Sequence, residues 1–269
     1  MERENPIGVF DSGVGGLSVL REIRRALPDE DLIYVADSKY APYGEQSEST
    51  IEQRSIAIAE FLAGESVKAI VVACNTATGV AIETLRSRFA VPVVGIEPAV
   101  KPATLKTTSG VIGVLATRQT LASAKFSRLV AAYGADVEVI SQPCPGLVEQ
   151  VEQGNLSSDA TRSLVEACVA PLLAKGADTL VLGCTHYPFL IPLIRDVAGP
   201  SVAILDPSVA VAIELRRRLQ ANDLLSQRTE PGSDRFLTSG SLAIARAAIA
   251  QLWTNSVEVE SLGAASGPE

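Results

Sequence analysis

Two stretches of the chain, VKAIVVACNT at residues 67–76 and DTLVLGCTHY at residues 178–187, decide the fold. In each stretch an apolar run ends at a cysteine, Cys74 or Cys184, and small polar residues follow at once. Such short apolar runs, bounded by a turn, are typical of buried strands that lead into helices. The two cysteines lie 110 positions apart (184 − 74). We therefore expect equivalent strand-to-helix turns in two similar halves.

Outward from these stretches, short apolar runs and amphipathic segments alternate along most of the chain. This alternation predicts an α/β protein with mostly parallel sheets. The continuous Val, Ile and Leu content of the runs indicates strands that are covered on both faces. Strands are expected at residues 7–10, 32–36, 68–73, 91–96, 110–115, 137–140, 179–182 and 202–205, and helices at residues 17–27, 76–89, 121–133, 158–175 and 208–220.

The composition indicates a globular protein with a large apolar core. The chain has 269 residues, of which 47% are apolar, and a net charge of −8. This negative balance and the lack of any Lys and Arg block argue against a nucleic-acid surface. No apolar run approaches the ~18–20 residues of a membrane span, and the start of the chain lacks the layout of a signal peptide. We expect a cytoplasmic protein with neither nucleic-acid nor membrane partners.

The cysteines are the strongest candidates for chemistry. The chain has four and no CxxC pair, so neither a disulfide framework nor a structural zinc site is expected. Cys74 and Cys184 each precede an expected helix, whose N-terminus stabilises a thiolate. Two like groups facing each other suit a reaction that inverts a carbon centre by proton transfer. A buried cysteine can also be a small apolar core residue, and we interpret Cys144 and Cys168 in that way.

His186 and Asp11 stand where they could assist the cysteines. His186 is the only histidine in the chain and lies two positions after Cys184. It could take a proton from that cysteine or return one, although it could also be an ordinary turn residue. Asp11 ends the first expected strand, where a carboxylate is either catalytic or a helix cap.

The segment Gly13-Val14-Gly15-Gly16 follows Asp11 and precedes an expected helix. Ser18 stands where a dinucleotide fingerprint needs its last glycine, and the Gly-Lys-Ser ending of a nucleotide-binding loop is missing. We interpret the segment as a tight turn whose N–H groups form an anion site at a helix start. No lysine stands out at a strand end as a Schiff-base residue. No cofactor is therefore expected, and no metal.

Four motifs of this chain resemble those of the glutamate racemases: GVFDSGVGGL at 8–17, PYG at 42–44, ACNTA at 73–77 and LGCTHYP at 182–188. The cysteine motifs are shared with the wider aspartate/glutamate racemase superfamily, whereas the others are more specific. The similarity runs from about residue 6 to 220 and continues more weakly to about 250. It implies cofactor-independent, two-base racemisation of L-glutamate to D-glutamate for bacterial peptidoglycan. It also implies two pseudo-symmetric αβα domains, 1–97 plus 208–269 and 98–207, with the active site in the cleft between them.

The resemblance also assigns roles to residues. Cys74 and Cys184 would be the proton-transfer residues, Cys74 acting on D-glutamate and Cys184 on L-glutamate, with Asp11 helping the first. His186 and Glu152 would help the second, although Glu149 lies one helical turn before Glu152 on a similar face. Substrate contacts would come from Asp11, Ser12, Tyr43, Gly44, Asn75, Thr76, Thr117, Thr120, Thr185 and His186. The segment 39–41 departs from the family pattern, which leaves the contacts of the entrance loop open.

Other interpretations stay open at this point. The chain could be an aspartate or hydantoin racemase of the same superfamily, which a panel of substrates would decide. It could be a hydrolase or decarboxylase that uses one cysteine, although the paired layout speaks against this. Cys74, Cys184 and His186 could instead bind a metal or take part in redox chemistry. A homodimer is compatible with the resemblance, since members of the family assemble in differing ways.

Overall fold

The computed structural model describes residues 2–253 and 257–263. Its strands are β1 (Ile7–Asp11), β2 (Leu32–Ala36), β3 (Ala69–Val72), β4 (Val93–Gly95), β5 (Val111–Ala116), β6 (Glu138–Pro143), β7 (Thr179–Gly183), β8 (Ala203–Leu205), β9 (Asp234–Thr238) and β10 (Val259–Ser261). Its α-helices are α1 (Leu17–Ala26), α2 (Glu48–Gly64), α3 (Asn75–Arg88), α4 (Val100–Lys106), α5 (Arg118–Ala122), α6 (Ala124–Tyr133), α7 (Leu147–Glu152), α8 (Asp159–Ala174), α9 (Ile191–Ala198), α10 (Ser208–Ala221) and α11 (Leu242–Leu252).

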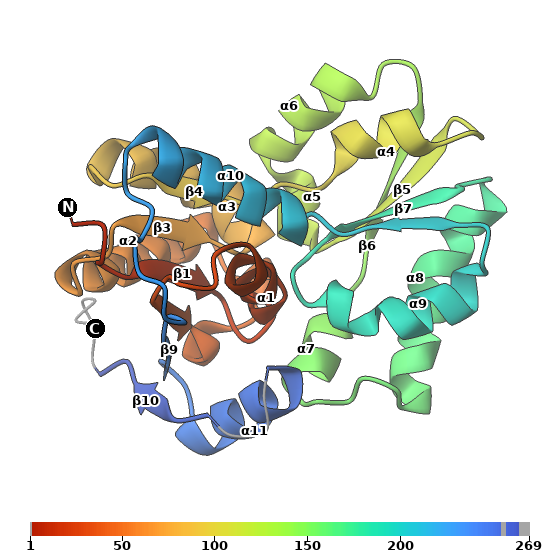
Figure 1. The fold of residues 1–269 in the computed structure, drawn as a ribbon. Coiled ribbons are helices and arrows are strands. Elements are labelled where there is room, and N and C mark those ends of the chain that lie inside the picture. Colours follow the sequence, from red (N-terminus) through yellow and green to blue (C-terminus); the bar gives the residue numbers. More distant parts are fainter. Residues whose placement is uncertain (1, 254–256, 264–269) are drawn as a thin grey trace.

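The strands form two sheets with helices packed against them (Figure 1). The six-stranded sheet has the order β10-β9-β2-β1-β3-β4, and the four-stranded sheet has the order β6-β5-β7-β8. Every neighbouring pair of strands is parallel. The expected α/β class with mostly parallel sheets is therefore confirmed.

The chain visits the two halves in the order first, second, first (Figure 1). It completes β4, builds the four-stranded sheet, and returns through α10, which packs against α1. Strand β9 then pairs with β2, so segments about 200 residues apart share one sheet. In Figure 1 the red, orange and blue elements accordingly lie together, and the yellow to cyan elements form the other half. The domain limits at 97/98 and 207/208 stay a prediction.

All eight expected strands are present, but some expectations were incomplete or wrong. The expected helix 121–133 is two helices, because Ser123 ends α5 and its Oγ accepts a hydrogen bond from the Phe126 N–H at the start of α6. Several elements were not expected, namely α2, α4, α11, β9 and β10. A helical turn at Glu149 and Glu152 and a helix after Cys184 were expected without bounds, and they correspond to α7 and α9. Strand β10 has only three residues, and β9 begins with two charged residues, Asp234 and Arg235, so it lacks the apolar run that identified the others.

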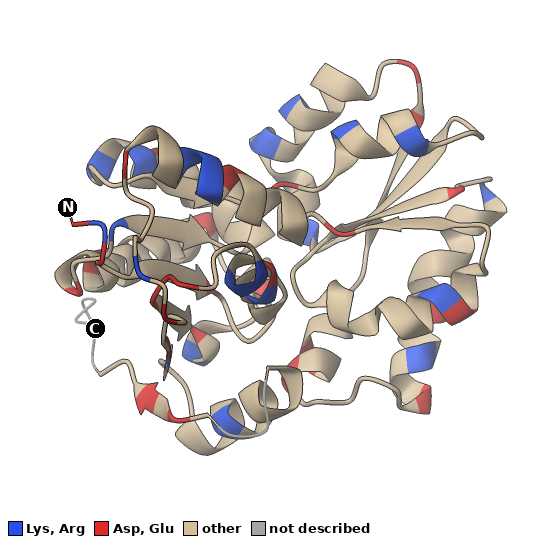
Figure 2. Ribbon diagram, in the orientation of Figure 1, with Lys and Arg blue, Asp and Glu red and all other residues tan. Residues whose placement is uncertain are grey.

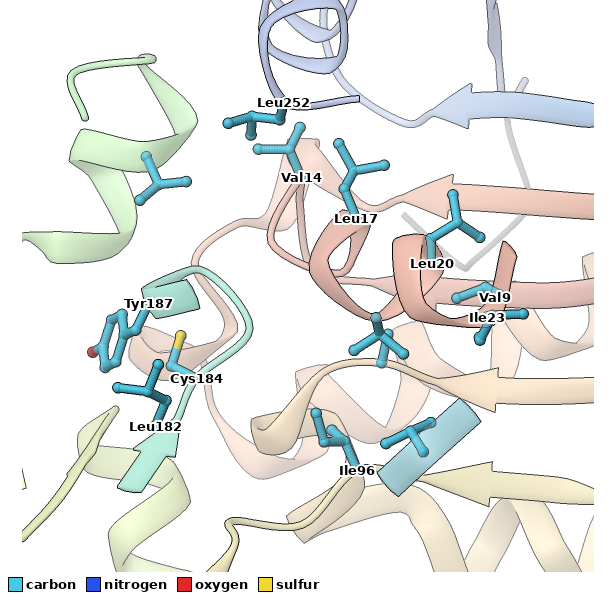
Figure 3. Packing of buried hydrophobic residues seen from close by; sticks show 14 of the residues in the cluster. Val9, Val14, Leu17, Leu20, Ile23, Ile96, Leu182, Cys184, Tyr187 and Leu252 are labelled. Atoms are coloured by element: carbon cyan, nitrogen blue, oxygen red, sulfur yellow. The ribbon is translucent and has the colours of Figure 1, made fainter. Parts of the chain in front are cut away.

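Apolar packing joins the two halves. One cluster of buried side chains includes Val14 and Leu17, which follow β1, and also Leu182 of β7 and Tyr187, which follows that strand. Figure 3 shows these two groups facing each other, with Cys184 among them. The carboxyl ends of β1 and β7 are therefore held against one another.

Charged residues are distributed over both halves. Figure 2 shows Lys and Arg interspersed with Asp and Glu on the helices. In the part of the chain that the structure describes, no helix combines the length and apolar character needed to cross a bilayer.

Candidate active site

Four expected site residues lie where strands end. Asp11 is the last residue of β1, Cys74 follows β3, Thr117 follows β5 and Cys184 follows β7. Ligands of open parallel sheets bind in the crevice outside these carboxyl ends. The two sheets thus present their crevices to one another.

Both cysteines line one cavity. The residues around it are Ser12, Pro42, Tyr43, Gly44, Cys74, Asn75, Thr76, Thr117, Val148, Cys184, Thr185 and His186. The cavity volume is about 10 Å³, which is room for about one water molecule. A wider hollow of about 410 Å³ adjoins it and shares Pro42, Gly44, Thr117 and Val148 with it. This hollow is the natural entrance.

Cys74 is a protonated thiol at the start of α3. It caps that helix, and its Sγ accepts a hydrogen bond from the Ala77 N–H at 3.4 Å. Burial raises the pKa of Cys74 to about 12, and the negative charge of Asp11 adds to the increase. The Ala77 hydrogen bond lowers the pKa but does not offset burial. Near neutrality Cys74 is thus a proton donor rather than a base.

Asp11 reaches both halves of the site. Its Oδ1 accepts hydrogen bonds from the Gly13 N–H at 2.9 Å and from Ser12 Oγ at 3.4 Å, and its Oδ2 accepts one from Thr185 Oγ1 at 2.9 Å. Ser12 Oγ in turn lies 3.9 Å from Cys74 Sγ. Complete burial raises the pKa of Asp11. The path from Asp11 to Cys74 therefore runs through the hydroxyl of Ser12.

Cys184, His186 and Glu152 form a connected row. Cys184 Sγ lies 3.7 Å from His186 Nδ1, and His186 Nε2 lies 2.7 Å from Glu152 Oε1. Burial opposes a charge on His186, but its hydrogen bonds to Cys184 and Glu152 outweigh this and raise its pKa well above the usual value. The imidazole is consequently well placed to hold a proton beside the Cys184 sulfur.

The glycine segment supports this row directly. The Val14 N–H donates to Glu152 Oε1 at 2.7 Å. A Cβ on Gly13 would lie 1.9 Å from Glu152 Oε1, and one on Gly15 would lie 2.3 Å from His186 Nδ1. The segment was expected to form an anion site, and the anion that it holds is a carboxylate of this chain. Glycine is needed because the other half approaches so closely.

The remaining lining is polar but without cationic side chains. The hydroxyls of Thr76, Thr117 and Thr120 lie 3.0–3.1 Å from one another and join the two halves. Asn75 is 4% exposed, and neither its Nδ2 nor its Oδ1 has a hydrogen-bond partner. A buried amide without partners costs free energy, so a ligand is the simplest reason for its presence. It points to a polar, hydrogen-bonding ligand.

Tyr43 and Gly44 form part of the wall in different ways. The Tyr43 phenol is buried and donates to Asp37 Oδ2 at 2.6 Å, and Arg54 pairs with both oxygens of Asp37 at 3.0 Å. This phenol is thus committed to structure. A Cβ on Gly44 would lie 2.8 Å from Thr117 Cβ, so glycine allows the two halves to touch here.

The structure brings together nearly all the residues named from the sequence. Thr120 lies behind Thr76 and does not line the cavity itself. Glu152 contacts His186, whereas Glu149 lines the entrance hollow instead. Pro42 and Val148 line the cavity and were not named as substrate contacts. Pro42 was noted only as part of the PYG motif, and a lone valine carries no local signal of function.

A sequence model of the Asp/Glu/hydantoin racemase family matches residues 7–215. The chain belongs to this family. Among its relatives, the glutamate racemase of Methylococcus capsulatus is 58% identical over 250 residues, which are 93% of this chain and 92% of that protein. The family's members are racemases, so the chain is an isomerase.

Solved structures of the family have the same fold. The crystal structure of a glutamate racemase isoform from Bacillus anthracis is 34% identical, with a TM-score of 0.87 and coverage of 97% of each chain. The structure of Escherichia coli glutamate racemase, which contains L-glutamate and the activator UDP-MurNAc-Ala, is 32% identical with a TM-score of 0.83. It covers 96% of this chain and 97% of that chain.

The metal interpretation finds no support in the arrangement of side chains. Across residues 2–253 and 257–263, no group of three His, Cys, Asp or Glu side chains is arranged to hold a metal ion.

Proposed function

We propose that this chain interconverts L- and D-glutamate without a cofactor, with Cys74 and Cys184 as opposed proton carriers. The observation that carries this proposal is one cavity lined by a thiol from each half. The relatives named glutamate racemase support the choice of substrate. The reaction would take place in the cytoplasm, and its product, D-glutamate, would be used for the synthesis of peptidoglycan.

The two cysteines have different neighbours, which gives them different roles. Cys74 has a pKa raised by burial to about 12 and is a thiol. Cys184 lies beside His186, whose pKa is raised despite burial by its hydrogen bonds to Cys184 and Glu152. A proton can pass from Cys184 to that imidazole and leave a thiolate next to an imidazolium. This state is ready for L-glutamate: Cys184 removes the α-proton and Cys74 protonates the opposite face.

The polar lining holds the carboxylates and stabilises the carbanion. The unpaired amide of Asn75 and the hydroxyl of Thr76 are donors available within the cavity. Hydroxyls of Ser12, Thr117 and Thr185 also line it, and those of Ser12 and Thr185 donate to Asp11. The N-terminus of α3 adds the positive end of a helix dipole. Preorganised donors in a site without bulk water can each contribute about 3–4 kcal/mol to a developing anion. This is how an acidic protein binds an anion without an arginine clamp.

Turnover in both directions requires the protons to be redistributed. After one conversion from L-glutamate, Cys184 carries a proton and Cys74 lacks one. Asp11 connects to Cys74 through Ser12, and Glu152 connects to Cys184 through His186. Each thiol therefore has its own acid–base partner for the return to the starting state.

Substrate entry requires the site to open. A cavity of about 10 Å³ holds about one water molecule, whereas an amino acid needs several times more room. The wider hollow lined by Pro42 and Gly44 leads to the cavity from outside. We infer that the loop at Pro42–Gly44 moves aside, or that the two halves separate, to admit glutamate. The site then closes again and excludes water.

A cysteine hydrolase is the second candidate, because Cys184, His186 and Glu152 also have the layout of an activated nucleophile. Whether the activity requires Cys74 distinguishes a racemase from a hydrolase. A hydrolase that uses Cys184 has no need of a second thiol across the cavity.

The test is racemisation of L-glutamate by the purified protein in buffer without added cofactor, followed by chiral chromatography. L-Aspartate and a 5-substituted hydantoin are run in parallel. Cys74→Ala and Cys184→Ala should each lose activity by about 1,000-fold or more. Cys168→Ala, a buried cysteine of α8 outside the cavity, is the matched control and should stay active. Activity retained in either cavity variant, or a strict need for pyridoxal phosphate, would overturn the proposal.

A further inference from the structure

Tyr34 of β2 is fully buried, yet it points a polar atom at the active-site loop. Its Oη donates to the Gly13 carbonyl at 2.6 Å. Its ring packs against Phe236 of β9, with the ring centroids 6.3 Å apart. A Cβ on Gly16 would lie 2.8 Å from Tyr34 Oη. The hydroxyl is therefore closely enclosed by the loop that it binds.

The Gly13 carbonyl is half of a peptide unit whose other half serves the site. The Val14 N–H of that same unit donates to Glu152 Oε1 at 2.7 Å. A peptide unit is planar, so a bond that fixes the direction of the carbonyl also fixes the direction of the N–H. A hydrogen bond at one end also polarises the other end. Tyr34 thus acts on Glu152 across one peptide.

We propose that Tyr34 is a positioning residue for racemisation: it holds the Gly13–Val14 peptide so that Glu152 orients His186 against Cys184. The role rests on the proposed function, because the orientation matters for catalysis only if His186 and Cys184 move protons. It links β2 of the first half to the acid–base partner of the cysteine in the second half.

Two observations support this role over simple core packing. Burial, together with the charges of Asp11 and Glu152, raises the pKa of Tyr34 well above its usual value, so the phenol stays a donor. The peptide that it binds holds a carboxylate 138 positions away in the sequence. A tyrosine that only filled space would not need a hydroxyl directed at that peptide.

The single histidine of the chain makes the proposal directly measurable. Imidazole labelled with ¹⁵N gives the signals of His186 alone, and its titration reports on Cys184, Glu152 and Asp11, the titratable groups around it. Tyr34→Phe should lower the pKa of His186 by about half a pH unit or more, because Glu152 is no longer held in place. Glu152→Gln should lower it at least as far. Ser55→Ala is the control: it removes a buried hydroxyl that donates to the Ile51 carbonyl on α2 and should leave the titration unchanged.

The kinetic prediction follows from the same geometry. Tyr34→Phe should reduce kcat/KM by about tenfold, and it should have little further effect in a Glu152→Gln background, since Tyr34 acts through that residue. Additive losses in the double variant, or a His186 titration in Tyr34→Phe identical to that of the unmodified protein, would overturn the proposal. The titration needs no turnover, so it separates a failure of this proposal from a failure of the proposed function. If Tyr34→Phe does not fold, 4-fluorophenylalanine at position 34 fills the space of the hydroxyl without donating, and the same titration decides.

Discussion

The protonation of Cys74 gives a quantitative test of the site. Burial raises its pKa from 9.0 to about 12, with the charge of Asp11 as the next cause. At about pH 8, about one in ten molecules of an ordinary thiol is ionised, whereas for Cys74 the ionised fraction is about one in ten thousand. A reagent that attacks thiolates should therefore modify Cys74 about 1,000 times more slowly than an ordinary thiol, which corresponds to about 4 kcal/mol.

The assay is alkylation by iodoacetamide at a series of pH values, with each cysteine peptide quantified by mass spectrometry. For Cys74 the rate should rise about tenfold per pH unit up to about pH 10 without reaching a plateau. Asp11→Asn removes a negative charge, so it should speed alkylation of Cys74 at every pH while abolishing racemisation. A plateau near pH 9 would refute the reasoning, as would an unchanged rate in Asp11→Asn.

Three further predictions concern stability and geometry. Above about pH 9 the unfolded chain releases the Cys74 proton, whereas the folded protein retains it until about pH 12. The stability due to this group is therefore complete below about pH 9 and is lost by about 1.4 kcal/mol per pH unit between about pH 9 and pH 12. The difference in unfolding free energy between the protein and Cys74→Ala should narrow over that range, and a difference that stays constant with pH would contradict this prediction. Asn75→Ala should leave the unfolding free energy unchanged or raise it by about 1 kcal/mol, because both polar atoms of the amide are unpaired. The same variant should raise KM for glutamate at least about tenfold. A large loss of stability with a normal KM would argue that Asn75 is structural. Gly15→Ala places a Cβ 2.3 Å from His186 Nδ1 and should cost about 100-fold in racemisation, whereas Gly64→Ala, whose Cβ meets nothing within 4 Å, should be silent in the same assay.

The location of the site could be predicted because it depends on local pattern. An apolar run followed by Cys74 or Cys184 places each thiol at the carboxyl end of a parallel strand, and that edge is where such sheets bind ligands. Asp11 was found by the same reasoning. These residues carry their positions in their immediate sequence neighbours.

The connections within the site could not be predicted, because they depend on distant partners. Glu149 and Glu152 lie on one short helix, and only contacts with Val14 and His186 distinguish them. Tyr34 resembles any buried aromatic residue of a strand until its hydroxyl is seen against Gly13. The position of β9 next to β2 likewise depends on a return of the chain that no local pattern announces.

The central claim is that two thiols act on opposite faces of one carbon, and deuterium incorporation in heavy water tests it most directly. Starting from L-glutamate, newly formed D-glutamate should carry deuterium at Cα from the first turnovers, while the remaining L-glutamate keeps its hydrogen. This is expected because Cys74 delivers a solvent-derived deuteron to the face opposite the one that Cys184 deprotonates. Retention of the original hydrogen in D-glutamate, or equal early labelling of both enantiomers, would contradict the account.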